Sequence, residues 1–529
     1  MRYIVSFLMA IVVFVSSGIP VYAQTAVSTN SVTSEIGQVL SDTTDLKKIE
    51  LLTEKIMKQS KIPGISMVIV DGDQCKYLNF GYANKAKQMK TTADTYYELG
   101  SMSKAFTALG VFLLQEEGKL SLEDPVTDYL PWLQFSYQGI NVGTRVDGSI
   151  ELKLRDLLYH TSGIPFDTIG YIPEGSSEDM LEKTVRNLNG TRLDFYPGEH
   201  YQYATVNYDI LGLIIQTISG ESFDHFLKQR VLQPLGLDNT YLFSGEAGQN
   251  SSKATGYKMT FFNAREYDAP SYRGNTPAGY VISNTKDMER WMRIQMGLVD
   301  VPKQLQTAIS HSHEADPKIE TLWDYEYAGG WNVKKQGDEI QHEGSNPNFS
   351  SMVIMKPEKK LGVCILSNLD SNASSYLAVN SMNILCGESV YEYTTDSYLL
   401  LDMFFSFAAV SIALLGGLFF MQIILIALQI RHGKRQRTQL SKKQAIGSTL
   451  GGVLIALVNI GVYFLPKLMF QNLPWSAVGV WGSPMILTSC VLFCILCWAL
   501  LAYILLLLLC PKVKGVNEDG ANRKHPGNC

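Results

Sequence analysis

Hydrophobic positions divide this 529-residue chain into one patterned segment and three continuous apolar segments. Residues 45–395 mix polar and apolar positions at helix and strand spacing, whereas residues 399–430, 445–465 and 485–509 are almost wholly apolar. A helix needs about 20 apolar residues to cross the hydrocarbon core of a bilayer. The pattern therefore predicts one globular domain followed by three transmembrane helices.

The globular segment shows both helix and strand periodicity. Helix spacing of apolar residues is found in residues 46–59, 101–117 and 208–218. Strand-like runs are found at 65–70, 77–82, 330–333, 340–342, 349–355 and 361–368. The first two runs flank Asp71-Gly72, which is typical of a β-hairpin. Strands at both ends with helices between them predict an α+β domain whose antiparallel sheet joins the two ends.

The first residues have the order of a secretory signal. Arg2 gives a positive start, residues 4–15 form an apolar core, and Val21-Tyr22-Ala23 is typical of a cleavage site. The alternative is a membrane anchor, for which the apolar core is short. We therefore expect a signal peptide at residues 1–23, a flexible Ser- and Thr-rich lead-in at 24–44, and export of residues 45–395.

Basic residues predict how the three apolar segments are oriented. The loop at 431–444 and the tail at 510–529 are rich in Lys and Arg, whereas Lys467 is the sole basic residue of the loop at 466–484. Cytoplasmic loops carry an excess of positive charge. We therefore expect a multi-pass plasma-membrane protein with the basic loop and tail in the cytoplasm. The globular domain and the 466–484 loop would then be extracytoplasmic.

Charge and cysteine content exclude several classes of function. The net charge is −5 and no basic stripe is present, which gives no reason to expect a nucleic-acid partner. Cys490, Cys494 and Cys497 share a helical stripe in the third apolar segment, without His or carboxylate beside them, so packing is the better interpretation than metal binding. The sequence thus predicts no metal and no cofactor.

The candidate chemistry begins at Ser101 and Lys104, which open the helix-patterned residues 101–117. Their Ser-x-x-Lys spacing places a hydroxyl and an amine one helical turn apart. A serine hydroxyl needs a nearby base to become a nucleophile, and a lysine can be that base once burial lowers its pKa. The same spacing recurs at Ser283 and Lys286, so other residues must decide between the two.

Two further motifs favour Ser101. Tyr203 lies just before the predicted helix at 208–218 and could offer its phenol to the site. Residues His342 to Ser345 lie on a strand-like edge, where Gly344 would let a substrate backbone approach and the Ser345 N–H would help to bind an oxyanion. Each motif taken alone is more often structural than catalytic.

Taken together, these motifs resemble the serine β-lactamase and penicillin-binding-protein-like family, which contains D-alanyl-D-alanine carboxypeptidases and class C β-lactamases. The resemblance covers roughly residues 45–390 and includes the runs at 157–163, 277–279 and 287–288. It implies a β-lactamase-like fold, an antiparallel sheet flanked by helices plus an all-helical region. It also implies Ser101 as nucleophile, Lys104 as its base and Tyr203 as proton shuttle, with His342-Glu343-Gly344 in place of the usual Lys-Thr-Gly.

One departure from the family's motifs points to a particular subgroup of the family. The family's second motif is usually Tyr-x-Asn, whereas here Thr205 stands in the Asn position. A small hydroxyl residue there, together with three C-terminal spans, is similar to the membrane-bound peptidases that activate nonribosomal peptide prodrugs, of the colibactin-maturation type. That subgroup removes an N-acyl-D-asparagine cap after export. The similarity implies that Asn346 contacts the D-Asn amide, and that a substrate-contacting His of the subgroup falls at Thr276.

The leading hypothesis is therefore an extracytoplasmic serine peptidase that cleaves an acylated, D-Asn-capped peptide prodrug. The main alternative is a cell-wall D,D-carboxypeptidase, an esterase or a β-lactamase of the same fold, and a non-catalytic binding or sensor protein is a third. The apolar segments are most simply an anchor in membrane lipid. A homodimer interface, lateral entry of a lipophilic substrate and a prodrug exporter as partner are hypotheses that stay open.

Overall fold

The computed structural model describes residues 45–137, 140–142, 151–243, 245, 252–316, 319 and 324–513. The expected signal peptide and lead-in, and the tail beyond residue 513, lie outside these residues. The described chain divides into two compact units, one formed by residues up to Leu401 together with Met469–Ser483, the other by Asp402–Leu468 and the residues from Pro484 onward.

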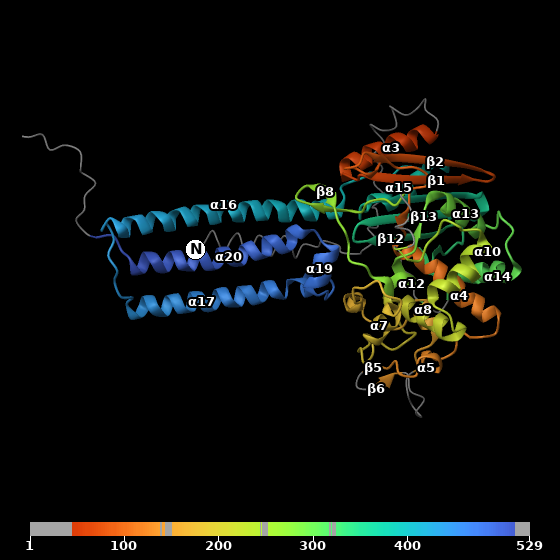
Figure 1. Ribbon diagram of the computed structural model, residues 1–529, viewed down its shortest axis with the longest axis horizontal. Helices are drawn as coiled ribbons and strands as arrows, with labels where there is room; N and C mark the ends of the chain where they lie inside the picture. The colour runs from red at the N-terminus through yellow and green to blue at the C-terminus, as the bar shows by residue number, and fades with distance from the viewer. Residues whose placement is uncertain are drawn as a thin grey trace, which may run out of the picture. The chain divides into compact units, whose positions relative to one another are not determined.

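An antiparallel sheet of eight strands organises the first unit (Figure 1). Its order is β10 (Tyr325–Tyr327), β11 (Asn332–Lys334), β12 (Ile340–Asn346), β13 (Phe349–Lys356), β14 (Leu361–Ser367), β1 (Gly64–Asp71), β2 (Gln74–Asn84) and β3 (Met89–Lys90). Among the described residues, three short strand pairs lie outside it: β4 (Tyr97–Glu98) with β9 (Ile282–Ser283), β5 (Phe135–Tyr137) with β6 (Ile140–Val142), and β7 (Tyr257–Thr260) with β8 (Asn263–Glu266).

Strands from the two ends of the domain pair with each other in this sheet, as the sequence predicts. β1 pairs with β2 on one side and with β14 on the other, so that Val68 lies between Tyr77 and Cys364. β13 and β14 are buried along their whole lengths, which explains why they lack the alternation of a half-exposed strand. The prediction of an α+β domain whose antiparallel sheet joins the two ends is confirmed.

Helices cover both faces of the sheet and build a separate helical region. The helices of the first unit are α3 (Asp45–Ser60), α4 (Ser103–Glu116), α5 (Val126–Tyr129), α6 (Leu154–Leu158), α7 (Met180–Arg186), α8 (Val206–Ser219), α9 (Phe223–Leu227), α10 (Gln233–Leu235), α12 (Thr276–Gly279), α13 (Thr285–Gln295), α14 (Lys303–Ser312) and α15 (Ala373–Leu385). Tighter or wider turns are η1 (Gly100–Met102), η2 (Phe166–Tyr171), η3 (Lys228–Leu232), η4 (Arg273–Asn275) and η5 (Pro357–Lys359). α3 and α15 pack together on one face of the sheet, and α13 packs on β1 and β14.

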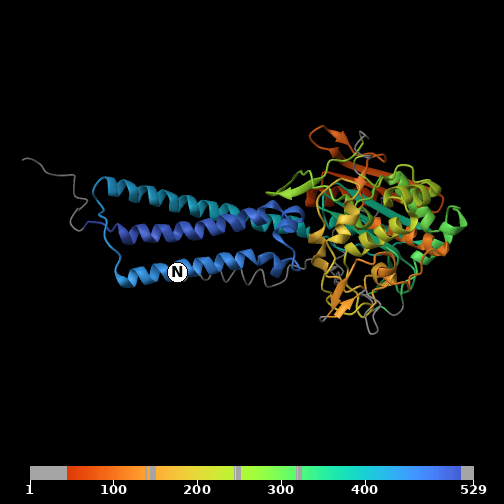
Figure 2. The same cartoon turned by 60° about the horizontal axis from the view of Figure 1, so that its bottom comes forward.

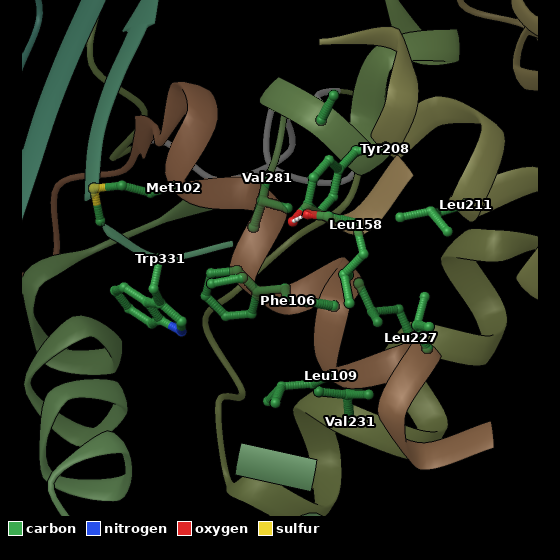
Figure 3. Close-up of a cluster of buried hydrophobic side chains, with 14 of the residues drawn as sticks. Met102, Phe106, Leu109, Leu158, Tyr208, Leu211, Leu227, Val231, Val281 and Trp331 are labelled. Carbon is green, nitrogen blue, oxygen red and sulfur yellow. Dashed lines mark hydrogen bonds between the residues drawn. The ribbon is translucent and has the colours of Figure 1, made fainter. Parts of the chain in front are cut away.

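α4 forms the centre of the core, because all but its last two residues are buried. Figure 3 shows its side chains Phe106 and Leu109 among residues from the helical region and from the sheet side. The Phe106 ring stacks on Trp291 of α13 with ring centroids 4.0 Å apart, and Trp291 lies in turn beside Trp331. α4 therefore fixes the residues at its N-terminal end relative to both the helices and the sheet.

The second unit is built from helices long and apolar enough to cross a membrane. These are α16 (Ser397–Arg431), α17 (Lys442–Tyr463) and α20 (Pro484–Leu509), and they run alongside one another in Figures 1 and 2. Each begins and ends within a few residues of its predicted apolar segment. Length and composition thus support membrane association.

The loop predicted at 466–484 is more ordered than its sequence suggests. It contains α18 (Leu465–Met469) and α19 (Trp475–Trp481), and residues Met469–Ser483 belong to the first unit. α19 packs against η2. Because this packing joins residues about 300 positions apart along the chain, local periodicity could not predict it.

Candidate active site

The turn that carries Ser101 is held from both sides. Ser101 lies in η1, directly before α4, where the Ser103 hydroxyl donates to the Gly100 carbonyl at 2.7 Å. The Ser103 hydroxyl also accepts a bond from the Val281 N–H at 3.0 Å. Ser101 itself is half-buried, so its hydroxyl is both fixed in place and accessible.

Lys104 is fully buried one turn further on, and its amine has three acceptors around it. Nζ lies 3.2 Å from Ser101 Oγ, 3.2 Å from Thr205 Oγ1 and 2.7 Å from the Ala278 carbonyl oxygen. Burial lowers the pKa of Lys104 to about 7, while the nearby Asp209 carboxylate acts in the opposite direction. A substantial fraction of the lysine is therefore neutral at neutral pH.

These contacts direct the lone pair of the neutral amine. A neutral amine has two N–H donors and one lone pair, whereas an ammonium has three donors. If the two donors bond Thr205 and Ala278, the lone pair faces the Ser101 hydroxyl. The arrangement can therefore accept the Ser101 proton, which is the chemistry needed to make that oxygen a nucleophile.

Tyr203 reaches the same serine from the helical region. Its hydroxyl donates to Ser101 Oγ at 2.9 Å. Burial raises the pKa of Tyr203 well above 10, so the phenol keeps its proton at neutral pH. Lys104 Nζ lies 5.0 Å from the centre of the same ring. The phenol is thus placed to give a proton to an atom bonded to the reacting centre.

An aromatic cluster positions Tyr203, and sequence reasoning missed it. The His160 ring lies 4.3 Å from the Tyr203 ring and 4.7 Å from that of Tyr327, measured between centroids. The Asn207 amide lies 3.0 Å from His160 Nδ1, and the Ala204 N–H donates to the same atom at 3.3 Å. Burial lowers the pKa of His160 well below 6.5, so it is a neutral positioning group.

Two glycines let the serine turn meet the edge of the sheet. A Cβ on Gly100 would lie 2.4 Å from the Ser345 nitrogen, and Gly100 adopts φ +55°. A Cβ on Gly344 would lie 1.9 Å from the Leu99 carbonyl oxygen. β11 pairs only with Ile340 and Gln341 of β12, which leaves the rest of that edge to face η1.

The backbone amide of Ser345 therefore lies beside the turn that carries Ser101. Together with the Ser101 N–H, it is positioned to bind a developing oxyanion. His342 lies on the same strand and is buried, with Nδ1 2.6 Å from the Glu343 carbonyl oxygen. Burial and the nearby Lys104 lower the pKa of His342 to about 3, so this position is neutral at pH 7.

Asn346 has a fixed amide orientation at the end of this strand. Its Nδ2 donates to Glu98 Oε2 at 2.8 Å and to the Gly279 carbonyl oxygen at 3.0 Å. Both amide hydrogens are thereby used, which leaves Oδ1 as the polar atom for a ligand. A Cβ on Gly279 would lie 3.6 Å from Oδ1, so the glycine leaves space on that side.

Thr276 is the sequence-predicted residue that lies apart from the others. Its hydroxyl donates to the Arg273 carbonyl at 2.8 Å, and it lines a hollow with Leu181 and Phe223. Its predicted contact with substrate stays a prediction. Ser101, Lys104, Tyr203, Thr205, Ser345 and Asn346, in contrast, surround one region.

The second Ser-x-x-Lys pair has no such arrangement. Ser283 is fully buried in β9, with its hydroxyl 2.9 Å from that of Thr240. Lys286 is half-exposed and pairs with Asp94 at 2.7 Å. Within the described ranges, no cluster of His, Cys, Asp and Glu could hold a metal ion, and all seven cysteines there are free thiols.

Comparisons with known proteins agree with this geometry. Residues 49–380 match the Beta-lactamase family. Protein flp of Staphylococcus aureus (strain COL) is 28% identical over 444 residues, covering 82% of this chain and 85% of that protein. Penicillin-binding protein 4* of Bacillus subtilis (strain 168) is 26% identical over 355 residues, covering 63% of this chain and 74% of the relative.

Solved structures show the same fold. The octameric penicillin-binding protein homologue from Pyrococcus abyssi superposes with a TM-score of 0.58 at 26% identity, over 68% of this chain and 81% of that one. A beta-lactamase/D-alanine carboxypeptidase from Pseudomonas syringae gives a TM-score of 0.54 at 23% identity, over 64% of this chain and 98% of that one. The chain therefore belongs to the Beta-lactamase family of serine hydrolases.

Proposed function

We propose that this chain is a membrane-anchored, extracytoplasmic serine peptidase that removes an N-acyl-D-asparagine cap from an exported peptide. The reaction would pass through an acyl-enzyme on Ser101. The orientation of the Asn346 amide is the observation that carries the substrate assignment. The three apolar helices support the membrane anchor, and the geometry of the site supports the peptidase reaction.

In the first step, Ser101 Oγ attacks the carbonyl carbon of the cap while neutral Lys104 takes the hydroxyl proton. The N–H groups of Ser101 and Ser345 bind the negative charge that develops on the carbonyl oxygen. Tyr203 then gives its phenolic proton to the leaving nitrogen as the C–N bond breaks, and it recovers a proton from Lys104. Water attacks the acyl-enzyme by the reverse sequence, which releases the acyl-D-asparagine and restores Ser101.

Asn346 supplies the recognition of the cap. Glu98 and the Gly279 carbonyl hold its amide so that Oδ1 can accept a hydrogen bond. A primary amide such as the asparagine side chain carries two N–H donors that fit this acceptor. Asn346 is 1% exposed, so an unpaired donor or acceptor there is costly and selects strongly between ligands.

Two features disfavour a substrate with a terminal carboxylate. His342 is neutral at pH 7, whereas the related enzymes usually have a lysine at this point of the strand. Thr205 is shorter than the Asn of the usual Tyr-x-Asn motif, and its hydroxyl is already engaged by Lys104. A β-lactam or a D-alanyl-D-alanine end therefore has fewer favourable contacts than in those enzymes.

A cell-wall D,D-carboxypeptidase remains the second candidate. Its support is the similarity to Penicillin-binding protein 4* and to a structure described as a beta-lactamase/D-alanine carboxypeptidase. Similarity to Protein flp covers 82% of the chain, more than the Beta-lactamase segment alone, so it extends beyond the hydrolase domain.

The proposal includes the membrane topology and the partners. The basic loop at 431–444 would face the cytoplasm and the hydrolase domain the opposite side. Lipid would surround the apolar helices, and an exporter would deliver the capped peptide. A homodimer formed by these helices is compatible with the same topology.

A pair of substrates tests the cap assignment. Full-length protein in detergent is given N-octanoyl-D-Asn and N-octanoyl-D-Ala amides of one fluorogenic amine. We expect kcat/KM to favour D-Asn by at least about tenfold, since a site that hydrogen-bonds a polar group strongly rejects an analogue without it. Asn346→Ala should remove this preference. Equal use of both substrates by the unmodified protein would refute the role of Asn346.

A further inference from the structure

Asn275 has an unused side-chain oxygen at the start of α12. It is the N-cap residue of this helix, where an Asn oxygen ordinarily accepts a bond from a backbone N–H of the first turn. Among the described residues, no backbone N–H makes this bond. Asn275 Nδ2 donates instead to Asp209 Oδ2 at 2.7 Å, which fixes the orientation of the amide. Oδ1 is therefore the atom that is left to accept a hydrogen bond.

This oxygen lies close to the side-chain oxygen of Asn346. A Cβ on Gly279 would lie 3.2 Å from Asn275 Oδ1 and 3.6 Å from Asn346 Oδ1, so the two oxygens are no further apart than the sum of these distances. Acceptors that bind the two hydrogens of one amide nitrogen are about 5 Å apart, for N···O distances of about 2.9 Å. That separation is within the limit. Any side chain at position 279 would crowd both oxygens, and the glycine leaves this position open.

Neither oxygen has a partner in the part of the chain that the structure describes. The side-chain hydrogen bonds of Asn275 and Asn346 all come from Nδ2. Asn275 is 5% exposed and Asn346 is 1% exposed, yet neither oxygen is among the fully buried polar atoms without a partner. Both oxygens therefore border on accessible space. An acceptor that has lost most of its water and gains no donor is costly, which favours a ligand that supplies donors to both.

The two oxygens lie next to the reacting groups. The carbonyl oxygen of Ala278, one residue before the glycine, accepts a bond from Lys104 at 2.7 Å. On the other side, Asn346 directly follows Ser345, whose amide nitrogen adjoins the turn that carries Ser101. An asparagine side chain is short, so its amide can reach only acceptors that lie this close to the attacked carbonyl carbon.

We infer that Asn275 is a second specificity-determining residue, whose Oδ1 and the Oδ1 of Asn346 bind the two N–H groups of one primary carboxamide. The inference rests on the proposed function, which identifies this carboxamide as the D-Asn side chain. Asp209 is a positioning residue that holds the Asn275 amide in the accepting orientation. A carboxylate has no hydrogen to donate and would meet two oxygens, and a methyl group would leave both unpaired.

The first experiment replaces the carboxamide with a ketone of the same shape. N-octanoyl-D-Asn and N-octanoyl-D-4-oxonorvaline, in which CH3 replaces NH2, are joined to one fluorogenic amine and compared by kcat/KM with full-length protein in detergent. Each lost hydrogen bond is worth about fivefold, so we expect a preference for D-Asn of at least about 20-fold. Asn275→Ala and Asn346→Ala should each lower this preference at least about fivefold. A preference that Asn275→Ala retains in full overturns the inference.

The ratio of the two substrates is measured because Asn275→Ala also changes the surroundings of Asp209, whose charge acts on Lys104. An effect on the base alters both substrates equally and cancels in the ratio. Asn239→Ala is the matched control, because its Nδ2 donates to the buried carboxylate of Asp287 at 3.2 Å. This variant should leave the ratio unchanged. An equal fall in Asn239→Ala would attribute the effect to a disturbed fold and overturn the role of Asn275.

A measurement on the unmodified protein does not depend on whether the variants fold. Methylation of the side-chain nitrogen of the D-Asn substrate keeps one N–H and removes the other. If both acceptors are engaged, methylation should lower kcat/KM at least about fivefold. Equal use of the methylated and unmethylated substrates overturns the inference.

Activated esters separate this inference from the proposed function. p-Nitrophenyl esters of the same two acyl-amino acids can acylate a nucleophilic serine whatever the natural leaving group is. The bond from Ser101 Oγ to the carbonyl carbon forms, the ester C–O bond breaks, Lys104 takes the hydroxyl proton and p-nitrophenolate leaves. Ser101→Ala gives the background rate.

A preference for the D-Asn ester that Asn275→Ala lowers at least about fivefold supports the inference, even if no peptide amide is cleaved and the proposed function fails. No preference between the esters, or a preference that Asn275→Ala retains, overturns the inference even if D-Asn amides are cleaved.

Discussion

The amine of Lys104 lies 3.2 Å from the hydroxyl oxygen of Ser101, in a position where burial lowers its pKa to about 7. The neutral amine is the form that can take the serine proton. We therefore predict that kcat/KM rises as pH increases through about 7 and levels off above it. The measurement is a pH–rate profile between pH 5 and 9 with a substrate that does not itself titrate. A profile that is flat across this range would show that Lys104 is not the base.

The phenol of Tyr203 is expected to act on the leaving group. Tyr203→Phe removes the hydroxyl 2.9 Å from Ser101 Oγ and keeps the ring that packs on His160. We predict that kcat falls by about 10² to 10⁴ with little change in thermal stability. Steady-state kinetics and a thermal melt of the same preparation check both parts.

Tyr201→Phe is the control for this change. Its ring also contacts Tyr327, but no described hydrogen bond joins its hydroxyl to Ser101. Its kcat should stay within about twofold of the unmodified protein. An equal loss in both variants would mean that disturbance of the aromatic cluster, and not proton transfer, explains the effect.

Two glycines with the same φ angle test the contact between the turn that carries Ser101 and the sheet. Gly100 and Gly72 both have φ +55°, but a Cβ on Gly72 has no neighbour within 4 Å. Each Gly→Ala variant should lose about 1 to 2 kcal/mol of unfolding free energy from backbone strain. Gly100→Ala should additionally slow acylation at least tenfold, because its Cβ displaces the Ser345 amide.

Urea unfolding and the rate of boronate binding measure these two effects separately. If Gly100→Ala binds a boronate as fast as Gly72→Ala does, the Ser345 amide does not contribute to the oxyanion site.

Thr205 is expected to limit reaction with β-lactams. Thr205→Asn introduces a carboxamide that reaches further into the site and can bond a β-lactam amide. One such hydrogen bond is worth about 1 kcal/mol, so we predict that benzylpenicillin acylates Ser101 about fivefold faster in this variant. Mass spectrometry of the covalent adduct gives the rate. Thr205→Ser keeps the hydroxyl and should show no gain, and a gain there would contradict the explanation.

Local sequence patterns predicted the elements with strong periodicity. The β1–β2 hairpin follows from Asp71-Gly72 and its flanking strands, and α8 follows from its apolar spacing and the Gly220 that ends it in a left-handed conformation. The three apolar helices follow from length and composition. Ser101 and Lys104 could be named because their spacing occurs together with the other motifs of the family that the sequence resembles, and Tyr203 could be named from that resemblance.

The remaining parts of the site depend on contacts between distant segments. The Ala278 carbonyl that binds Lys104 is 174 residues away, and although the run 277–279 is part of the family resemblance, no local pattern predicts its contact with the amine. The buried Asp209 bonds the Asn275 amide at 2.7 Å and lies near Lys104 only because α8 packs on α4 and α12. α19, and the Lys258 amine that donates to its Gly479 and Val480 carbonyl oxygens, could likewise not be predicted, since a helix of 7 residues is too short to give a periodic signal.

The central claim is tested most directly by the stereochemistry of cleavage. Full-length protein is incubated with a peptide capped by N-octanoyl-D-asparagine and with its L-asparagine counterpart, and the released cap is quantified by mass spectrometry. The account predicts release from the D-Asn peptide, at least 100-fold slower release from the L-Asn peptide, and none with Ser101→Ala. Equal release from both peptides, or faster cleavage of acyl-D-alanyl-D-alanine than of the D-Asn peptide, would contradict it.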